Sequence, residues 1–229
     1  MSTAVTLLSA GAVKPGLMKV IDAYHRDTDY QVTVTFATAP EIRQRLTTGE
    51  AADVVIAPQN LLDELARGRR ISDEHLTIGR VGVGVLVRAA GPLPKIATVD
   101  EFRKSLLDAD SIVYNQASTG IYIERLFQRL GIATALQAKT TRYPDFAAVL
   151  AHVGKGQGNE IGLGATTVII ENASKGVRFV GPLPEEIQNY TTYAAAVVAH
   201  AETRDAARAL VRYLGDAAAQ AIFSAAGIQ

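Results

Sequence analysis

The feature that most constrains the fold is the alternation of short, Val- and Ile-rich runs with longer amphipathic stretches. Several runs are apolar at consecutive positions, which is typical of strands covered on both faces. Between them apolar residues recur at helical spacing, as after Pro15, where Leu17, Val20, Ile21 and Tyr24 share one face. This alternation predicts parallel α/β units. The predicted strands are Val5–Ser9, Gln31–Phe36, Asp53–Ala57, Val81–Val87, Ser111–Tyr114, Glu160–Leu163, Val177–Val180 and Tyr193–Val198.

Two extended apolar runs, Gly79–Arg88 and Asn189–Val198, are the candidates for chain crossings between two lobes. Two crossings make the first lobe discontinuous. It then comprises residues 1–80 plus 197–229, and the second lobe comprises residues 81–196. We therefore expect two Rossmann-like α/β lobes with mixed, mostly parallel sheets, a two-strand hinge and a ligand cleft between the lobes.

Composition excludes several classes of function. Lys+Arg and Asp+Glu both number 23, so there is no electrostatic footprint for nucleic acid or an anionic membrane. Without cysteine there are no disulfides, thiolate nucleophiles or thiolate metal sites. No run reaches the ~18 apolar residues that would span a bilayer. The N-terminal residues do not read as a signal peptide, which leaves a cytoplasmic protein, or a periplasmic one whose export signal precedes this numbering, as alternatives.

The familiar catalytic motifs are absent. The chain has no Gly-x-Ser-x-Gly nucleophile elbow and no phosphate-binding loop. The glycines of Gly154–Gly158 read as a surface turn. The four histidines are scattered without metal-ligand spacing, so neither a metal nor another cofactor is expected.

Small polar residues stand instead at strand-to-helix junctions, where an open parallel sheet binds its ligands. Helix N-termini at these junctions present unpaired N–H groups that suit an anion. In the first junction, Ser9 and Gly11 precede the helix and Lys14 adds charge, although a tight turn with a solvated lysine is the alternative. In the second, Thr38 caps the following helix, binds a ligand, or does both.

The third junction contains Ser118, Thr119 and Gly120 and is the most suited to an anion. Arg80, at the first crossing, is a candidate cation, with a surface salt bridge as the alternative. Tyr190, at the second crossing, either closes on a ligand or packs the hinge. Arg142 is a weaker candidate of the same kind as Arg80.

The order of these motifs resembles the molybdate-binding solute-binding proteins of ABC transporters, and more broadly the type 2 periplasmic binding proteins. The resemblance runs over nearly the whole chain. Its landmarks are Gly49–Ala57, Ser118–Tyr122, Glu160–Gly164 and Ala225–Ile228. It implies the type 2 fold, a small anionic ligand, an ABC permease as partner, a monomer and a periplasmic location.

Position by position, the chain departs from the molybdate-binding pattern. The family's first-loop serine falls near Val13, its second-loop hydroxyl at Thr38 or Ala39, and its third-junction N–H contact near Thr119. Its late tyrosine falls near Ala165, with Thr166 beside it. Loss of a tyrosine enlarges the site, and Lys14 and Arg80 add charge. A carboxylate, which arginine grips with two hydrogen bonds, is therefore at least as suitable as an oxyanion.

Three hypotheses follow. The first is a solute-binding protein that captures a carboxylate or a molybdate-like oxyanion for an ABC transporter. The second is a cytoplasmic isomerase of a small unsaturated carboxylic acid, because aconitate isomerase uses a similar frame. That reaction needs a general base, for which Tyr122, Tyr190 and His152 are guesses that packing also explains. The third is a cytoplasmic ligand sensor.

Overall fold

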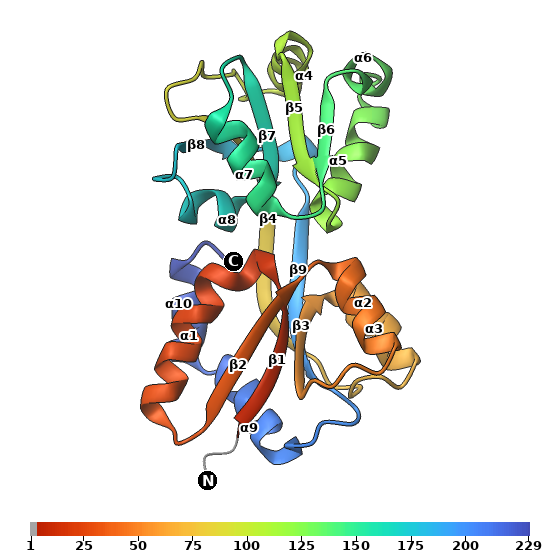
Figure 1. Ribbon diagram of the computed structural model, residues 1–229, viewed down its shortest axis with the longest axis vertical. Helices are drawn as coiled ribbons and strands as arrows, with labels where there is room; N and C mark the ends of the chain where they lie inside the picture. The colour runs from red at the N-terminus through yellow and green to blue at the C-terminus, as the bar shows by residue number, and fades with distance from the viewer. Residues whose placement is uncertain (1–3) are drawn as a thin grey trace. The chain divides into compact units, whose positions relative to one another are not determined.

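The computed structural model describes residues 4–229 and divides into two compact units (Figure 1). Unit 1 comprises the chain up to Val81 together with Thr191–Gln229, and unit 2 comprises Gly82–Tyr190. The chain passes from one unit to the other inside two strands, β4 (Leu76–Arg88) and β9 (Tyr190–Val197). Both lie where the sequence shows extended apolar runs. The ligand cleft between the units stays a prediction.

The sheet of unit 1 has the strand order β2-β1-β3-β9 (Figure 1). Strands β2, β1 and β3 are parallel, and β9 runs antiparallel to β3. All five residues of β3 are buried, as expected of a central strand covered on both faces. The bounds are β1 Ala4–Ala10, β2 Gln31–Ala37 and β3 Val54–Pro58.

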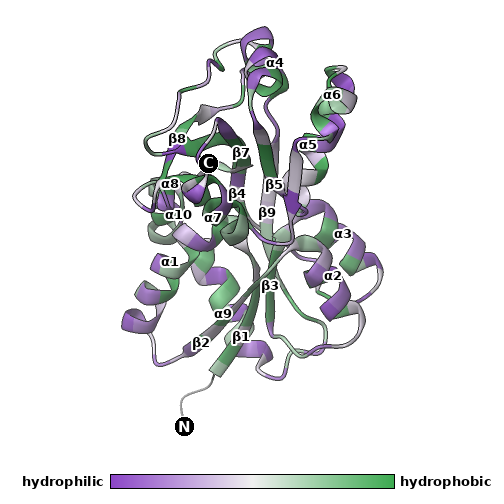
Figure 2. Ribbon diagram, turned by 45° about the horizontal axis from the view of Figure 1, so that its top comes forward, coloured by the Kyte–Doolittle hydropathy of each residue, from purple (hydrophilic) through white to green (hydrophobic). Residues whose placement is uncertain are grey.

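The helices of unit 1 bury one apolar stripe each. In α9 the stripe consists of Ala206, Ala207, Leu210 and Leu214, whose spacing is helical. Figure 2 shows the contrast between β3, which is hydrophobic along its length, and α2, which is mostly hydrophilic. The bounds are η1 Gly11–Val13, α1 Lys14–Asp27, α2 Ala39–Thr47, α3 Gln59–Arg67, α9 Arg204–Leu214 and α10 Ala217–Ala225.

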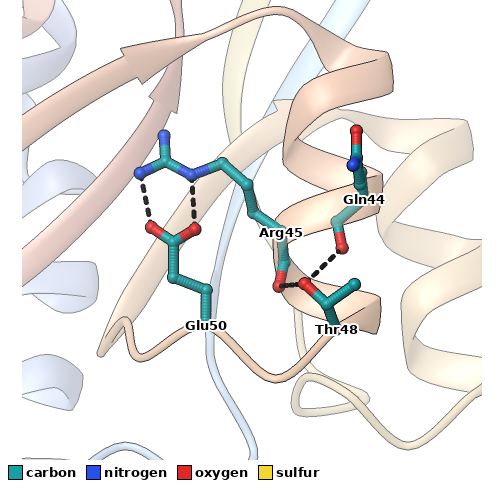
Figure 3. Close-up of polar contacts among 4 residues, drawn as sticks. All are labelled: Gln44, Arg45, Thr48 and Glu50. Atoms are coloured by element: carbon teal, nitrogen blue, oxygen red, sulfur yellow. Dashed lines mark hydrogen bonds and ion pairs between the residues drawn. The ribbon is translucent and has the colours of Figure 1, made fainter.

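The turn from α2 to β3 belongs to the landmark Gly49–Ala57 and is held by a forked ion pair (Figure 3). The Nε of Arg45 donates to Glu50 over 2.7 Å, and a second guanidinium nitrogen donates to the other carboxylate oxygen. Arg45 thereby holds the pKa of the Glu50 carboxyl below its ordinary value. Gly49 has φ +86°, a left-handed backbone conformation that residues with a side chain rarely adopt. These contacts give the landmark a structural role in closing the turn.

The sheet of unit 2 has the order β4-β7-β5-β6, and β8 also pairs with β4. Strands β7, β5 and β6 are parallel, whereas β4 runs antiparallel to β7 and to β8. Apolar clusters cover both faces. Phe102, Phe127 and Leu163 belong to one cluster, and Leu86 and Val149 to the other. The bounds are β5 Ser111–Asn115, β6 Thr140–Tyr143, β7 Glu160–Ala165 and β8 Val177–Pro182.

Two helices of unit 2, α4 (Val99–Asp108) and α7 (Phe146–Lys155), begin at side-chain caps. The hydroxyl oxygen of Thr98 accepts from the Glu101 amide over 3.2 Å, and the Glu101 carboxylate accepts from the amide of Ala97 over 3.1 Å. The bounds are α4 Val99–Asp108, α5 Ser118–Arg129, α6 Ala133–Gln137, α7 Phe146–Lys155, α8 Thr166–Glu171 and η2 Glu185–Ile187.

The predicted fold class is confirmed: α/β units with mixed, mostly parallel sheets, joined by two strands. Strand β6 was not predicted from the sequence. It is the edge strand, and its residues Thr140–Tyr143 are polar or half-exposed. None of the helices among residues 4–229 is long and apolar enough to cross a membrane.

Candidate functional site

The first two junctions lie at one edge of the unit 1 sheet, because β1 and β2 are neighbouring parallel strands with Ser9 opposite Phe36. The ammonium nitrogen of Lys14 lies 5.4 Å from the centre of the Phe36 ring. This cation–π contact holds the lysine between the two junctions. The positive charge of Lys14 therefore lies at the first junction, where the sequence predicts contact with an anion.

The other residues of the first junction differ in their availability. Ser9 is fully buried, and its hydroxyl donates to the Ala10 carbonyl over 3.2 Å. Gly11 begins the single turn η1, and a Cβ built there would meet none of the described atoms within 4 Å. The open space lies over Gly11, so its backbone is the accessible part of this junction. Val13, at the position of the family's serine, is fully buried.

Thr38 stands immediately before α2 and is bound to Glu41. The Glu41 carboxylate accepts from the Thr38 amide (2.7 Å) and from its hydroxyl (2.8 Å). This is the reciprocal half of a capping box. The hydroxyl proton is thus engaged by a carboxylate, which favours the capping role over a donor role toward an anion.

The third junction, between β5 and α5, keeps its amides available. The amides of Ser118, Thr119 and Gly120 precede the first bond of the helix, from Ile121 to the carbonyl of Ala117. In the described chain no side chain caps this end, and the first turn contains no acidic residue. Unpaired N–H groups and the helix dipole make it attractive to an anion.

A second junction of unit 2 lies at the same sheet edge. Strands β5 and β7 are parallel neighbours with Tyr114 opposite Leu163, so β7 delivers Thr166 beside the α5 junction. Thr166 is half-buried, and its methyl carbon lies 3.1 Å from a Cβ built on Gly84. The predicted residues of unit 2 therefore gather at one edge of one sheet.

Arg80 and Tyr190 belong to the strands that connect the units. Arg80 is exposed, and its backbone pairs with Gln229 in both directions, over 2.6 and 3.0 Å. Tyr190 is 44% exposed, and its ring lies 3.2 Å from a Cβ built on Gly82. Their contacts with a ligand stay a prediction.

Gln188 is not among the residues predicted from the sequence. Its side chain links β4 to the residues just before β9. Its amide accepts from the backbone N–H groups of Val83 (2.9 Å) and Asn189 (2.9 Å) and donates to the Val83 carbonyl (3.0 Å). Nothing in the pattern around a lone glutamine signals this role.

The guessed bases have structural partners. The Tyr122 hydroxyl donates to the Ile187 carbonyl over 2.6 Å and accepts from Arg129 over 3.1 Å. His152 has its Nδ1 3.0 Å from the Tyr143 hydroxyl, with the rings in an edge-to-face arrangement. For these two residues the packing explanation is the better supported.

The glycine stretch and Arg142 have polar partners within unit 2. Among residues 4–229 no three His, Asp or Glu side chains group as metal ligands. In the glycine stretch the Glu160 carboxylate accepts from the Gly158 amide, and Asp110 accepts from the Asn159 amide, each over 2.8 Å. Arg142 is paired with Glu124, both of them within unit 2.

The chain has the features of the type 2 periplasmic binding proteins. These features are two α/β units joined by two strands, with helix N-termini after the parallel strands. The chain belongs to the family of bacterial extracellular solute-binding proteins, whose model matches residues 5–229.

Three relatives illustrate the range of this family's neighbours. An aconitate isomerase of a Pseudomonas species is 32% identical over 219 residues, 93% of this chain and 82% of that protein. A molybdate-binding protein of Escherichia coli K12 is 24% identical over 85% of this chain and 77% of its own. The periplasmic molybdate-binding protein of Azotobacter vinelandii shares the fold with a TM-score of 0.80 at 17% identity, covering 98% of both chains.

Proposed function

We propose that this protein reversibly binds a small anion, a carboxylate or a molybdate-like oxyanion, and delivers it to an ABC permease. The observation that carries the proposal is the N-terminus of α5, whose first amides lack a side-chain cap and whose first turn lacks a carboxylate. Oriented backbone amides hold an anion without needing a net charge on the protein.

The charged residues of unit 1 point to the carboxylate. Lys14 is held at the first junction by Phe36, and Arg80 is exposed at the start of the connecting strand. Val13 and Ala165 offer no hydroxyl where the molybdate-binding pattern has one. A site with fewer neutral donors and added cations suits a carboxylate, because arginine binds its two oxygens with parallel hydrogen bonds.

A calorimetric screen tests this proposal, with molybdate, tungstate, sulfate, citrate and cis-aconitate as ligands. We expect at least one anion to bind, and Arg80→Met to weaken carboxylate binding by about tenfold or more. Arg103→Met, an exposed arginine on α4, is the matched control and leaves affinity unchanged. Failure of every anion to bind contradicts the proposal.

The second candidate function is isomerisation of a small unsaturated carboxylic acid. It is favoured by the 32% identity to an aconitate isomerase over 93% of this chain. The same anion site would hold the carboxylates, and a base would move a proton beside one of them. Proton NMR with cis- and trans-aconitate tests it, and absence of turnover at high protein concentration counts against it.

A further inference from the structure

A cavity of about 350 Å³ lies within unit 2. Its walls come from β5, β6, the later turns of α5 and the short helix α6. Its size is at the lower end of small-molecule sites. The lining residues are Tyr114, Glu124, Phe127, Gln128, Ala133, Thr134, Gln137, Thr140 and Arg142.

Tyr114 contributes a hydroxyl group to this wall. The residue as a whole is only 3% exposed. Burial raises the pKa of Tyr114 to about 12, with a further contribution from Glu124, so the hydroxyl stays neutral and able to donate. A neutral hydroxyl in the wall can donate a hydrogen bond to a ligand in the cavity.

Arg142 and Glu124 form an ion pair in the same wall. Arg142 stands opposite Tyr114 in the β5–β6 register, and Glu124 reaches it from α5. Their side chains are 51% and 40% exposed, so the pair is open to solvent and contributes little to stability. A ligand can therefore separate the two charges at small cost.

We propose that this cavity binds a small zwitterion, a molecule with one carboxylate and one ammonium group such as a free α-amino acid. The carboxylate replaces Glu124 as the partner of Arg142, and the ammonium group replaces Arg142 as the partner of Glu124. Both protein charges stay paired throughout. The Tyr114 hydroxyl and the amides of Gln128 and Gln137 are available to a polar ligand side chain.

Charge complementarity selects this class over simpler ions. A lone anion on Arg142 would leave Glu124 unpaired beside it, and a lone cation on Glu124 would do the same to Arg142. Each case adds like-charge repulsion that a zwitterion avoids. The proposed site takes Glu124 from the second turn of α5, whereas the anion of the proposed function binds the first turn.

The test is a ¹H–¹⁵N NMR titration of the full chain with L-glutamine, with acetate and methylammonium as single-charge controls at matched ionic strength. We expect L-glutamine to shift amide signals of Tyr114, Glu124, Gln137 and Arg142, and each control to bind at least about tenfold more weakly. Equal binding by acetate, or no shift with L-glutamine, overturns the proposal.

Variants separate the site from a surface effect. Arg142→Met and Glu124→Gln should each weaken L-glutamine binding by about tenfold, whereas Arg125→Met, an exposed arginine on the same helix, should leave it unchanged. Tyr114→Phe should weaken binding severalfold with the same pattern of shifted signals. Each variant is first shown to retain the wild-type amide spectrum outside the cavity. Wild-type affinity in both Arg142→Met and Glu124→Gln overturns the proposal.

Discussion

Gly120 lies directly against the backbone carbonyl of Asn115, so closely that a Cβ built on Gly120 would be 1.7 Å from that oxygen. Asn115 ends β5, and Gly120 is in the first turn of α5. The close approach of these two backbones sets the direction in which α5 leaves the sheet. The amides at the start of α5 therefore keep this position only because residue 120 is a glycine and has no side chain.

Gly120→Ala should destabilise the protein by about 2 kcal/mol or more, because backbone must move to admit the methyl group. Gly11→Ala is the matched control at the first junction, where the built Cβ meets open space, and it should change stability by less than about 1 kcal/mol. Urea denaturation of both variants measures the difference. Equal free energies of unfolding for the two variants would show that the turn between β5 and α5 can move to admit the methyl group without a cost in stability.

Asp53 should make the free energy of unfolding depend on pH. The residue is 4% exposed, and its carboxylate accepts from the amide and hydroxyl of Thr6, both over 2.8 Å, and from the Thr203 amide over 3.0 Å. Burial raises the pKa of the Asp53 carboxyl, but these hydrogen bonds outweigh burial and leave the pKa below its ordinary value.

Because the folded-state pKa is the lower one, the stabilisation is fully present above the unfolded value of about 3.9 and is lost as pH falls through the folded-state pKa. Asp53→Asn should cost about 1–3 kcal/mol near neutral pH and flatten the acid limb of the stability profile. Thermal melts from neutral to strongly acidic pH measure it. A variant with the wild-type acid limb would contradict the assignment.

The order and type of most elements could be predicted from the sequence, because buried strands and amphipathic helices carry strong periodic signals. The edge strand β6 could not, since Thr140, Thr141 and Arg142 carry no apolar signal, and its pairing with β5 is a long-range contact. The short helix α6 was missed for a similar reason, as five residues are too few for a period.

The candidate site was predictable in outline only. The positions of Ser118 and Gly120 follow from the rule that ligands bind at the carboxyl ends of parallel strands. The use of each hydroxyl does not follow from any such rule. Ser9 donates to its neighbour's carbonyl and Thr38 to Glu41, and both partners are local choices among several that the sequence permits.

Asp145→Ala should destabilise the start of α7. The Asp145 carboxylate accepts from the Ala148 amide over 2.9 Å, which satisfies one of the unpaired N–H groups at the helix end. Loss of this cap costs about 1 kcal/mol. Urea denaturation checks it, with Asp145→Asn as the control that keeps the acceptor and most of the stability. A loss of the same size in both variants would argue for a charge effect and against capping.

Tyr122→Phe should separate packing from chemistry in the isomerase hypothesis. The substitution removes the hydroxyl that donates to the Ile187 carbonyl and accepts from Arg129. Because the carbonyl loses its partner, we expect a loss of about 1 kcal/mol in stability. Anion affinity, and aconitate turnover if the wild-type protein shows any, should remain unchanged, as calorimetry and proton NMR would measure. Turnover lost at unchanged stability would instead make Tyr122 a catalytic residue, whose bond to Ile187 must then open during the reaction.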